Sequence, residues 1–316
     1  MDADAQSTSQ STTATTRSAV DLGAVPAVPG AAKPDALIVG DNITRKFGGL
    51  TAVDVDHIEI QRGVITALIG PNGAGKTTLF NLLTGFDVPD SGSWSLNGGS
   101  LAGVASYKVA RRGMVRTFQL TKVLSKLTVM DNMLLGATGQ RGEKLLSALL
   151  PFRWRAQEEA NAERANHLLA RFKLDAKRED FAGSLSGGQR KLLEMARALM
   201  VDPELIMLDE PMAGVNPALK QSLLGHVKSL RDEGRTVLFV EHDMDMVRDI
   251  SDWVIVMAQG KIVAEGTPQA VMQDPAVIDA YLGAHHDTDL RDMDEAAIEA
   301  VAEAELEAET HGEATP

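Results

Sequence analysis

A glycine-rich run at residues 70–77, Gly-Pro-Asn-Gly-Ala-Gly-Lys-Thr, has the composition and spacing of a phosphate-binding loop. It matches the pattern G-x-x-x-x-G-K-[ST], in which glycines let successive backbone N–H groups point at one phosphate. Lys76 would supply a positive charge to the β- and γ-phosphates, and the Thr77 hydroxyl would bind Mg²⁺. A glycine turn without a ligand is the alternative, but an apolar run precedes the loop and a helical pattern follows it. We therefore predict a nucleotide site here.

Two adjacent carboxylates, Asp209 and Glu210, stand at the end of a second apolar run. Asp209 is suited to holding Mg²⁺ through a water molecule, and Glu210 to polarising a water that attacks a phosphate. A strand that ends in a solvated acidic turn is the alternative, which the phosphate loop disfavours. The pair is therefore a candidate for the chemical step of nucleotide hydrolysis.

A second glycine-rich segment opens a predicted helix at Ser186, a natural N-cap, and comprises Leu185, Ser186, Gly187, Gly188 and Gln189. One interpretation is a capped helix with a glycine turn. The other is a second anion site at a helix N-terminus. Because the chain already has one phosphate loop, such a site would serve a nucleotide held by another subunit.

The elements that must position these residues alternate between strands and helices. Strands are predicted at Val64–Ile69, Glu204–Leu208, Thr236–Val240 and Trp253–Met257, and a helix at Thr77–Leu83. This alternation indicates a parallel sheet with crossover helices, in which polar groups collect at the carboxyl ends of the strands. The middle of the chain, at about 88–200, is predicted to be mainly helical, with an apolar stripe at Ala165, Leu168, Leu169 and Phe172.

Composition excludes several classes of protein. The 316 residues contain no cysteine, which excludes a disulfide framework, a cysteine-ligated zinc site and a thiol nucleophile. No apolar run approaches the ~20 residues that span a bilayer, so we expect a soluble chain that meets a membrane only through a partner. The net charge of −13 makes the chain a poor electrostatic match for nucleic acid.

Both ends of the chain differ from the middle. Nine of the first twenty residues are Ser or Thr, and a Pro/Ala/Gly/Val stretch follows, so we expect residues 1–35 to be disordered. Residues 284–316 are an acidic tail, and 287–316 alone carry eleven Asp or Glu and one Arg. We expect this tail to be solvated and at most marginally helical, with a docking role as the alternative.

Taken together, the motifs resemble those of the ATP-binding subunits of ABC transporters. The phosphate loop, Gln119, the signature at 185–189, the Asp209–Glu210 pair and His242 follow one another in the order and spacing of that family. The resemblance covers about Leu37 to Gly283. It implies an α/β fold, a P-loop NTPase of ABC type with a mixed sheet core in a domain at 36–283, and a helical subdomain at about 88–200.

The resemblance also implies roles for single residues. Phe47 would stack on adenine, with an ordinary core phenylalanine as the alternative; Gln119 would sense Mg²⁺ and the attacking water; and His242 would contact the γ-phosphate. Asn216 stands where many members have an Asp, which weakens a charged contact across the dimer. The implied catalytic set is Glu210, His242, Gln119 and Lys76, and the implied metal ligands are Thr77, Gln119 and Asp209. The implied nucleotide-binding set is Phe47, Gly70, Pro71, Asn72, Gly73, Ala74, Gly75, Lys76, Thr77, Thr78, Ser186, Gly187, Gly188 and Gln189.

Within the family, four segments look like the branched-chain amino-acid importer type, which includes urea and amide importers. They are Lys46–Val53, Arg116–Gln119, Asp209–Pro217 and Tyr281–Gly283. Many members of that type carry a variant signature, so the standard one at 185–189 is a departure. The ATPase of lipopolysaccharide export is the nearest rival; it shares the segment after Asp209 and the Tyr-Leu-Gly but fits less well at Phe47 and Gln119.

The resemblance implies a motor that hydrolyses ATP with Mg²⁺ to drive an importer. Its partners would be transmembrane permeases, a second ATPase, identical or a paralogue, in a head-to-tail dimer, and indirectly a solute-binding protein. The chain would lie at the cytoplasmic face of the inner or plasma membrane. A soluble ABC ATPase of translation or DNA repair is a rival, but those types carry two such domains or long coiled-coil insertions. A phosphate-loop kinase or GTPase is disfavoured by the signature and His242.

Overall fold

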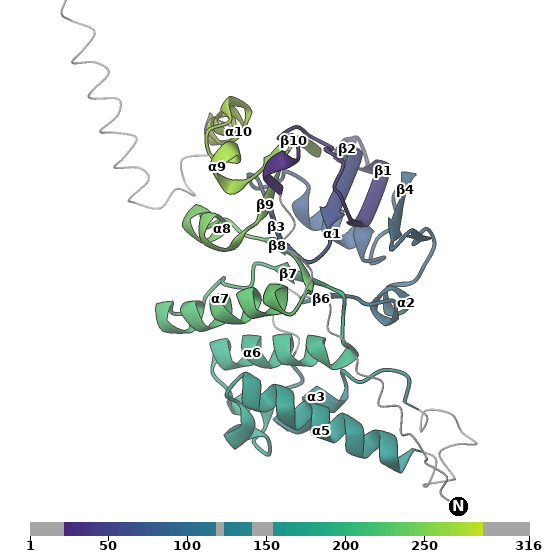
Figure 1. The fold of residues 1–316 in the computed structure, drawn as a ribbon, viewed down its shortest axis with the longest axis vertical. Helices are drawn as coiled ribbons and strands as arrows, with labels where there is room; N and C mark the ends of the chain where they lie inside the picture. The colour runs from purple at the N-terminus through teal and green to yellow at the C-terminus, as the bar shows by residue number, and fades with distance from the viewer. Residues whose placement is uncertain (1–21, 118–122, 141–153, 287–316) are drawn as a thin grey trace, which may run out of the picture.

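The computed structural model of the chain describes residues 22–117, 123–140 and 154–286. In chain order, the elements are η1 (Leu22–Ala24), β1 (Ala36–Phe47), β2 (Leu50–Gln61), β3 (Ile65–Ile69), α1 (Lys76–Leu83), β4 (Ser91–Leu96), β5 (Gly99–Ser100), α2 (Ser106–Arg111), β6 (Met114–Arg116), α3 (Val129–Leu134), α5 (Arg155–Arg171), η4 (Asp175–Lys177), η5 (Ala182–Ser184), α6 (Gly187–Ala198), η6 (Leu199–Val201), β7 (Leu205–Asp209), α7 (Pro217–Asp232), β8 (Thr236–Val240), α8 (Met244–Ile250), β9 (Trp253–Ala258), β10 (Lys261–Gly266), α9 (Pro268–Val271) and α10 (Pro275–His286). Figure 1 shows the strands in the upper and middle parts of the view and α3, α5 and α6 stacked below them.

A six-stranded sheet forms the centre of the fold, in the order β10-β9-β3-β8-β7-β6. Its strands pair in parallel except for β10, which runs antiparallel to β9. Strands β3, β7 and β8 are buried along their whole length, as the continuous apolar runs predict for a sheet covered on both faces. The predicted strands therefore agree with the observed ones to within one residue at each end, and the mixed sheet confirms the α/β fold class.

A second, antiparallel sheet has the order β2-β1-β4-β5. Strands β4 and β5, together with β6 of the central sheet, fall within the segment at 88–200 that was predicted to be mainly helical. That prediction is wrong for the first part of the segment, and the helical region begins only at α3. The period-2 signal is short there: in β4, Trp94 and Leu96 are buried while Ser91 and Ser93 are exposed.

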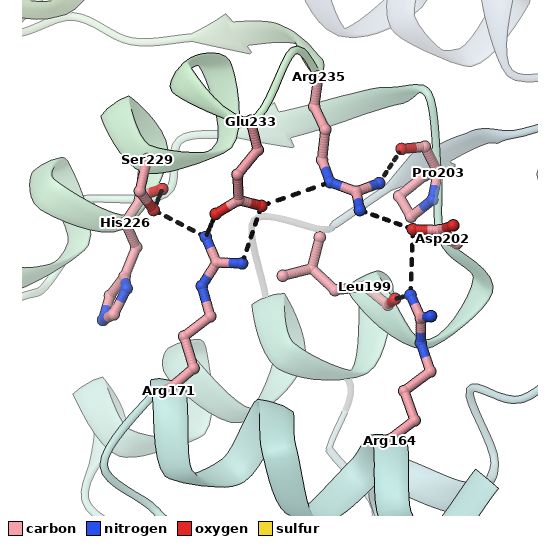
Figure 2. A network of polar contacts seen from close by, with 9 residues as sticks. All are labelled: Arg164, Arg171, Leu199, Asp202, Pro203, His226, Ser229, Glu233 and Arg235. Carbon is pink, nitrogen blue, oxygen red and sulfur yellow. Dashed lines mark hydrogen bonds and ion pairs between the residues drawn. The ribbon is translucent and has the colours of Figure 1, made fainter. Parts of the chain in front are cut away.

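The helical region packs α3 and α6 against α5. The predicted stripe on α5 is confirmed, because Ala165, Leu168 and Leu169 are buried in a shared apolar cluster, and Phe172 follows at the end of the helix. A polar network joins this region to the end of α7 and the start of β8 (Figure 2). Arg171 of α5 pairs with Glu233 at 2.7 Å, and Arg164 of α5 pairs with Asp202 at 3.2 Å.

Residues 22–35 pack against the body of the protein, so the expectation of disorder across 1–35 does not hold for them. Leu22 and Val25 are buried in an apolar cluster that also contains Leu37 and Ile38 of β1. The Lys33 ammonium is fully buried and lies 3.2 Å from the Glu265 carboxylate of β10. Trp253 Nε1 donates to the same carboxylate at 3.1 Å, and the Lys33 ammonium lies 4.8 Å from the centre of the Trp253 ring. The sequence pattern missed this because the contacts that anchor the segment, such as the pair of Lys33 with Glu265, join residues that lie far apart in the sequence.

Among the described residues, no helix is both long and apolar enough to cross a bilayer.

Candidate functional site

The predicted chemistry collects at the carboxyl edge of the central sheet. Strands β3, β7 and β8 run in parallel, with Asp209 beside Val240 in the register, so Glu210 and His242 emerge next to the loop that follows β3. A pocket of about 680 Å³ opens there. Its lining residues are Phe47, Leu50, Thr51, Ala52, Asn72, Gly73, Ala74, Gly75, Lys76, Thr77, Thr78, Glu210, His242 and Gln259.

The phosphate loop is fixed by close backbone contacts. Gly70 has a φ of 143°, and a Cβ at this position would lie 2.0 Å from the carbonyl oxygen of Met257 in β9, so only glycine fits. Lys76 folds back over the loop, where its ammonium donates to the carbonyl oxygens of Gly70 at 2.6 Å and Pro71 at 2.8 Å. Burial lowers the pKa of Lys76, and the charges of Glu210 and Asp209 oppose that shift.

Glu210 and His242 meet at the edge of the pocket. His242 Nε2 lies 2.7 Å from Glu210 Oε1. Glu210 has a φ of 47°, an uncommon conformation for a residue with a side chain, and its N–H donates to the Val240 carbonyl at 3.1 Å. The backbone therefore turns sharply after β7 and aims the carboxylate into the pocket rather than along the strand.

Two further side chains hold the segment around Glu210, and the motif analysis did not find them. The Lys191 ammonium of α6 donates to the carbonyl oxygens of Glu210, Pro211 and Ala213 at 3.2, 3.1 and 2.6 Å. The Glu241 carboxylate is 5% exposed and accepts from the Met212 N–H at 2.9 Å. Burial raises the pKa of Glu241, and the backbone donors oppose that shift. The only sequence signal for either residue was its place beside a motif.

Asp209 lies behind the pocket, in a buried ion pair with Arg116. Arg116 Nη2 donates to Asp209 Oδ2 at 2.6 Å, and the two side chains are 4% and 6% exposed. The sequence analysis singled out Arg116 only as part of a family segment and gave it no role. A basic residue at the end of a short strand in front of Gln119 was the one available signal. Gln119 itself lies outside the described residues.

The signature residues Ser186 to Gln189 form the start of α6 and are not among the residues that line the pocket. Ser186 is the N-cap, as predicted: its hydroxyl accepts from the Gln189 N–H at 3.2 Å, and the Gln189 side chain accepts from the Ser186 N–H at 3.0 Å. Asn216 caps α7, accepting from the Leu219 N–H at 2.9 Å. The capped helix is thus observed, and service to another subunit's nucleotide stays a prediction.

Phe47 stands at the rim of the pocket, where 48% of it is exposed and the Arg45 guanidinium lies 4.8 Å from its ring centre. It is therefore not an ordinary core phenylalanine. The sequence analysis missed Leu50, Thr51 and Ala52, which follow it around the β1–β2 turn, and Gln259 of the β9–β10 turn. Leu50, Thr51 and Ala52 belong to the family segment Lys46–Val53, which gave them no role, and only the folded turns bring these residues and Gln259 to the pocket.

Comparison with known proteins agrees with this geometry. Residues 53–213, about half of the chain, match the family model described as ABC transporter. The chain belongs to the ABC transporter ATP-binding family. It is an ABC-type ATPase. Residues 261–287 also match the model described as branched-chain amino acid ATP-binding cassette transporter.

Curated relatives cover nearly the whole of this ATPase domain. The chain is 41% identical over 243 residues to a probable branched-chain amino acid transport ATP-binding protein LivG of Archaeoglobus fulgidus, covering 77% of this chain and 94% of the relative. It is 41% identical over 244 residues to the high-affinity branched-chain amino acid transport ATP-binding protein BraF of Pseudomonas aeruginosa, covering 76% and 95%. It is 42% identical over 250 residues to LivG of Salmonella typhimurium, covering 78% and 98%.

Solved structures give the same answer. A nucleotide-free ATP-binding cassette from an ABC transporter superposes with a TM-score of 0.68 at 38% identity, covering 78% of this chain and 98% of that one. An ADP conformation of such a cassette superposes with the same score and identity, covering 78% and 99%. The ABC family resemblance stated from the motifs is therefore confirmed.

Proposed function

We propose that this ABC ATPase is the motor subunit of an importer for branched-chain amino acids. The observation that carries the proposal is the pocket in which the phosphate loop and Lys76 face the Glu210–His242 pair, in a chain about 41% identical to subunits named for that transport. The pocket supports the assignment of ATP hydrolysis, and the similarity to the relatives supports the assignment of the transported substrate. Branched-chain amino acids are the class named by the curated relatives and by the model matched at residues 261–287.

ATP would enter with its triphosphate on the loop and its base at the rim. The amides of residues 71–77 and the start of α1 provide donors for the phosphates, and the Lys76 ammonium exchanges the Gly70 and Pro71 carbonyls for phosphate oxygens. Phe47, exposed at the rim with Arg45 against its ring, offers a flat face on which adenine stacks. Thr78 and Gly75 complete the cradle.

Mg²⁺ fits the donor set present beside the loop. Thr77 and Asp209 supply a hydroxyl and a carboxylate, and Gln119, outside the described residues, would supply an amide oxygen. Mg²⁺ usually needs only one or two protein carboxylates because phosphates and water fill its other positions. This fits the lack of any larger His/Asp/Glu cluster among the described residues. When bound, the ion neutralises charge that develops on the phosphates.

Glu210 and His242 would carry the chemical step. Glu210 accepts a hydrogen bond from the attacking water and draws off its proton, and His242 donates from its ring toward the γ-phosphate. His242 Nε2 and Glu210 Oε1 are 2.7 Å apart, so before nucleotide binds these two side chains hydrogen-bond to each other. Nucleotide binding would exchange this contact for the water and the phosphate.

A second ATPase subunit would complete the site. Residues 186–189 do not line their own pocket, so in a head-to-tail dimer the start of α6 would face the partner's nucleotide. The donors would be the Gly187 and Gly188 N–H groups, since the Ser186 and Gln189 N–H groups donate within the capping box. The partner is a paralogue or a second copy of this chain. Asn216, which caps α7 with its side chain, offers no charge to that interface.

The similarity to ATP-binding proteins of branched-chain amino acid transport supports a proposal for the other subunits. The partners we propose are two multispan permeases and, indirectly, a solute-binding protein. The subunit would lie on the cytoplasmic face of the inner or plasma membrane, held there by the permeases.

Isolation of the native complex from detergent-solubilised membranes tests this assignment, with subunits identified by mass spectrometry. We expect two permeases, a second ATPase and a solute-binding protein that retains leucine, isoleucine or valine. Permeases accompanied by lipid-handling proteins and no solute-binding protein would instead indicate an exporter. Recovery of the chain without any membrane protein would contradict the transport function and leave the ATPase chemistry intact.

A further inference from the structure

One buried guanidinium joins the helix of the phosphate loop to the strand that ends in Asp209. Arg116 is the last residue of β6 and pairs in register with Met207 of β7. Its Nη2 donates to Asp209 Oδ2 and its Nη1 to Asn81 Oδ1 on α1, both at 2.6 Å. Its planar group also lies 5.5 Å from the centre of the Phe80 ring.

The position of Asn81 on α1 connects this bridge to Thr77. Asn81 lies four residues after Thr77 on α1, so the two side chains share one face of the helix. Thr77 and Asp209 are the two described residues proposed to hold Mg²⁺. The planar Arg116 guanidinium therefore fixes the distance between α1, which carries Thr77, and the Asp209 carboxylate.

The chemistry of arginine suits this role better than that of lysine. A guanidinium presents several N–H donors in one plane, and it serves two acceptors on different elements at once. An ammonium keeps the charge but has no planar fork, so it cannot hold Asp209 and Asn81 in the same geometry. The Arg116 side chain is only 4% exposed, so bulk water does not replace an N–H donor that is lost on substitution.

We propose that Arg116 is a positioning residue that sets the divalent-cation affinity of the nucleotide-loaded site by fixing the Asp209 carboxylate against α1. This inference rests on the proposed function, since it assumes that Asp209 and Thr77 face the cation of a bound nucleotide. Arg116 itself does not line the nucleotide pocket. Its effect therefore falls on the metal and not on the nucleotide.

The test is a titration of the full chain with Mn²⁺ in saturating ADP, followed by electron paramagnetic resonance of the free ion. ADP binding is measured separately in EDTA. Arg116→Lys keeps the charge and removes the bridge, and we expect its Mn²⁺ dissociation constant to rise about tenfold while its ADP affinity in EDTA stays within twofold of wild type. Asn81→Ala keeps the Asp209 pair and loses one arm, so its constant rises less.

Arg231→Lys is the matched control, because Arg231 pairs with Asp252 and Asp232 away from the pocket, and its Mn²⁺ titration stays at the wild-type value. Thermal unfolding checks that each variant is folded. If Arg116→Lys does not fold, the Mn²⁺ titration of Asn81→Ala still tests the inference. An unchanged or tighter Mn²⁺ constant in a folded Arg116→Lys, or a loss of ADP binding in EDTA, overturns the inference. Failure of the wild-type chain to bind ADP counts instead against the proposed function.

Discussion

Asp202 adopts an uncommon backbone conformation and also pairs with two arginines. It has a φ of 56°, in the left-handed region that Asn and Asp tolerate better than other residues with side chains. Its Oδ1 accepts from Arg235 at 2.6 Å and from Arg164 at 3.2 Å (Figure 2). The hydrogen bond from Arg235 lowers the pKa of Asp202; burial opposes this shift, and Arg164 adds to it.

Asp202→Asn keeps the backbone conformation and removes the charge. A carboxyl whose pKa is lower in the folded state contributes stability above its unfolded pKa of about 3.9, and loses it as pH falls through the folded value. We expect the variant to be less stable than wild type by about 1 kcal/mol at pH 7, since 63% of the side chain is exposed and screened. The deficit should shrink toward pH 3.5, as measured by urea unfolding.

Asp245→Asn is the control, because Asp245 pairs with Arg248 on an exposed helix surface with 84% of its side chain in solvent. Its deficit should be close to zero at both pH values. A deficit for Asp202→Asn that stays constant from pH 7 to pH 3.5 would remove the ion pairs as its cause.

At the residue scale, the motifs predicted many of the side chains that line the site, but not the side chains that hold them in place. Lys76, Thr77, Glu210 and His242 all line the pocket, because their spacing along the chain reflects strand ends that meet in a parallel sheet. Arg116, which pairs with Asp209, could not be assigned in the same way. Its partners lie 35 and 93 residues away in the sequence, and no local pattern encodes such a contact.

A buried ion pair, together with buried apolar side chains, holds the segment at residues 22–35 to the body of the protein. The Lys33 ammonium lies between Glu265 of β10 and the Trp253 ring of β9, and it also donates to the Ala31 carbonyl. Removing one member of a buried pair leaves the other charge without compensation in a medium of low polarity. The segment therefore contributes to stability through this polar contact as well as through its buried apolar residues Leu22, Val25 and Ala31.

Lys33→Met should be less stable than wild type by roughly 3 kcal/mol, the low end for a broken buried pair, because Glu265 keeps its bonds from Ala31 and Trp253. Lys261→Met is the matched control: Lys261 pairs with Asp54, but 65% of its side chain is exposed, so its loss should be about 0.5 kcal/mol or less. Urea unfolding at neutral pH measures both. Equal losses in the two variants would contradict the structural role of the buried pair.

At the element scale, long regular elements were predictable and short ones were not. β8 was predicted with its observed bounds because its four apolar residues, Val237–Val240, follow Thr236 in a run that is buried along its whole length. β4 and β6 were assigned to a helical region because runs of three to six residues give no clear period. Residues 22–35 were expected to be disordered because composition does not show contacts between residues far apart in the sequence, such as the pair of Lys33 with Glu265.

At the scale of the whole molecule, the fold brings two regions to one network. The pocket lies at the edge of the central sheet, and the signature lies at the start of α6, which packs with α3 and α5. Lys191 of α6 donates to the Glu210 carbonyl. Movement of α6 therefore acts directly on the segment that carries the proposed catalytic carboxylate. This connection gives a physical route by which a partner bound to the helical region could affect hydrolysis.

The central claim is that hydrolysis at the Glu210 site drives the import of branched-chain amino acids. The most direct measurement is the uptake of radiolabelled leucine into proteoliposomes that contain the purified native complex. We expect the wild-type complex to accumulate leucine only with ATP and Mg²⁺.

Glu210→Gln should bind ATP normally and hydrolyse it at least ~100-fold more slowly, because the water loses its base, and it should give no accumulation. Glu179→Gln, a control at an exposed surface pair, should transport at the wild-type rate. Uptake by Glu210→Gln at the wild-type rate, or ATP hydrolysis by the wild-type complex without any leucine uptake, would contradict the claim.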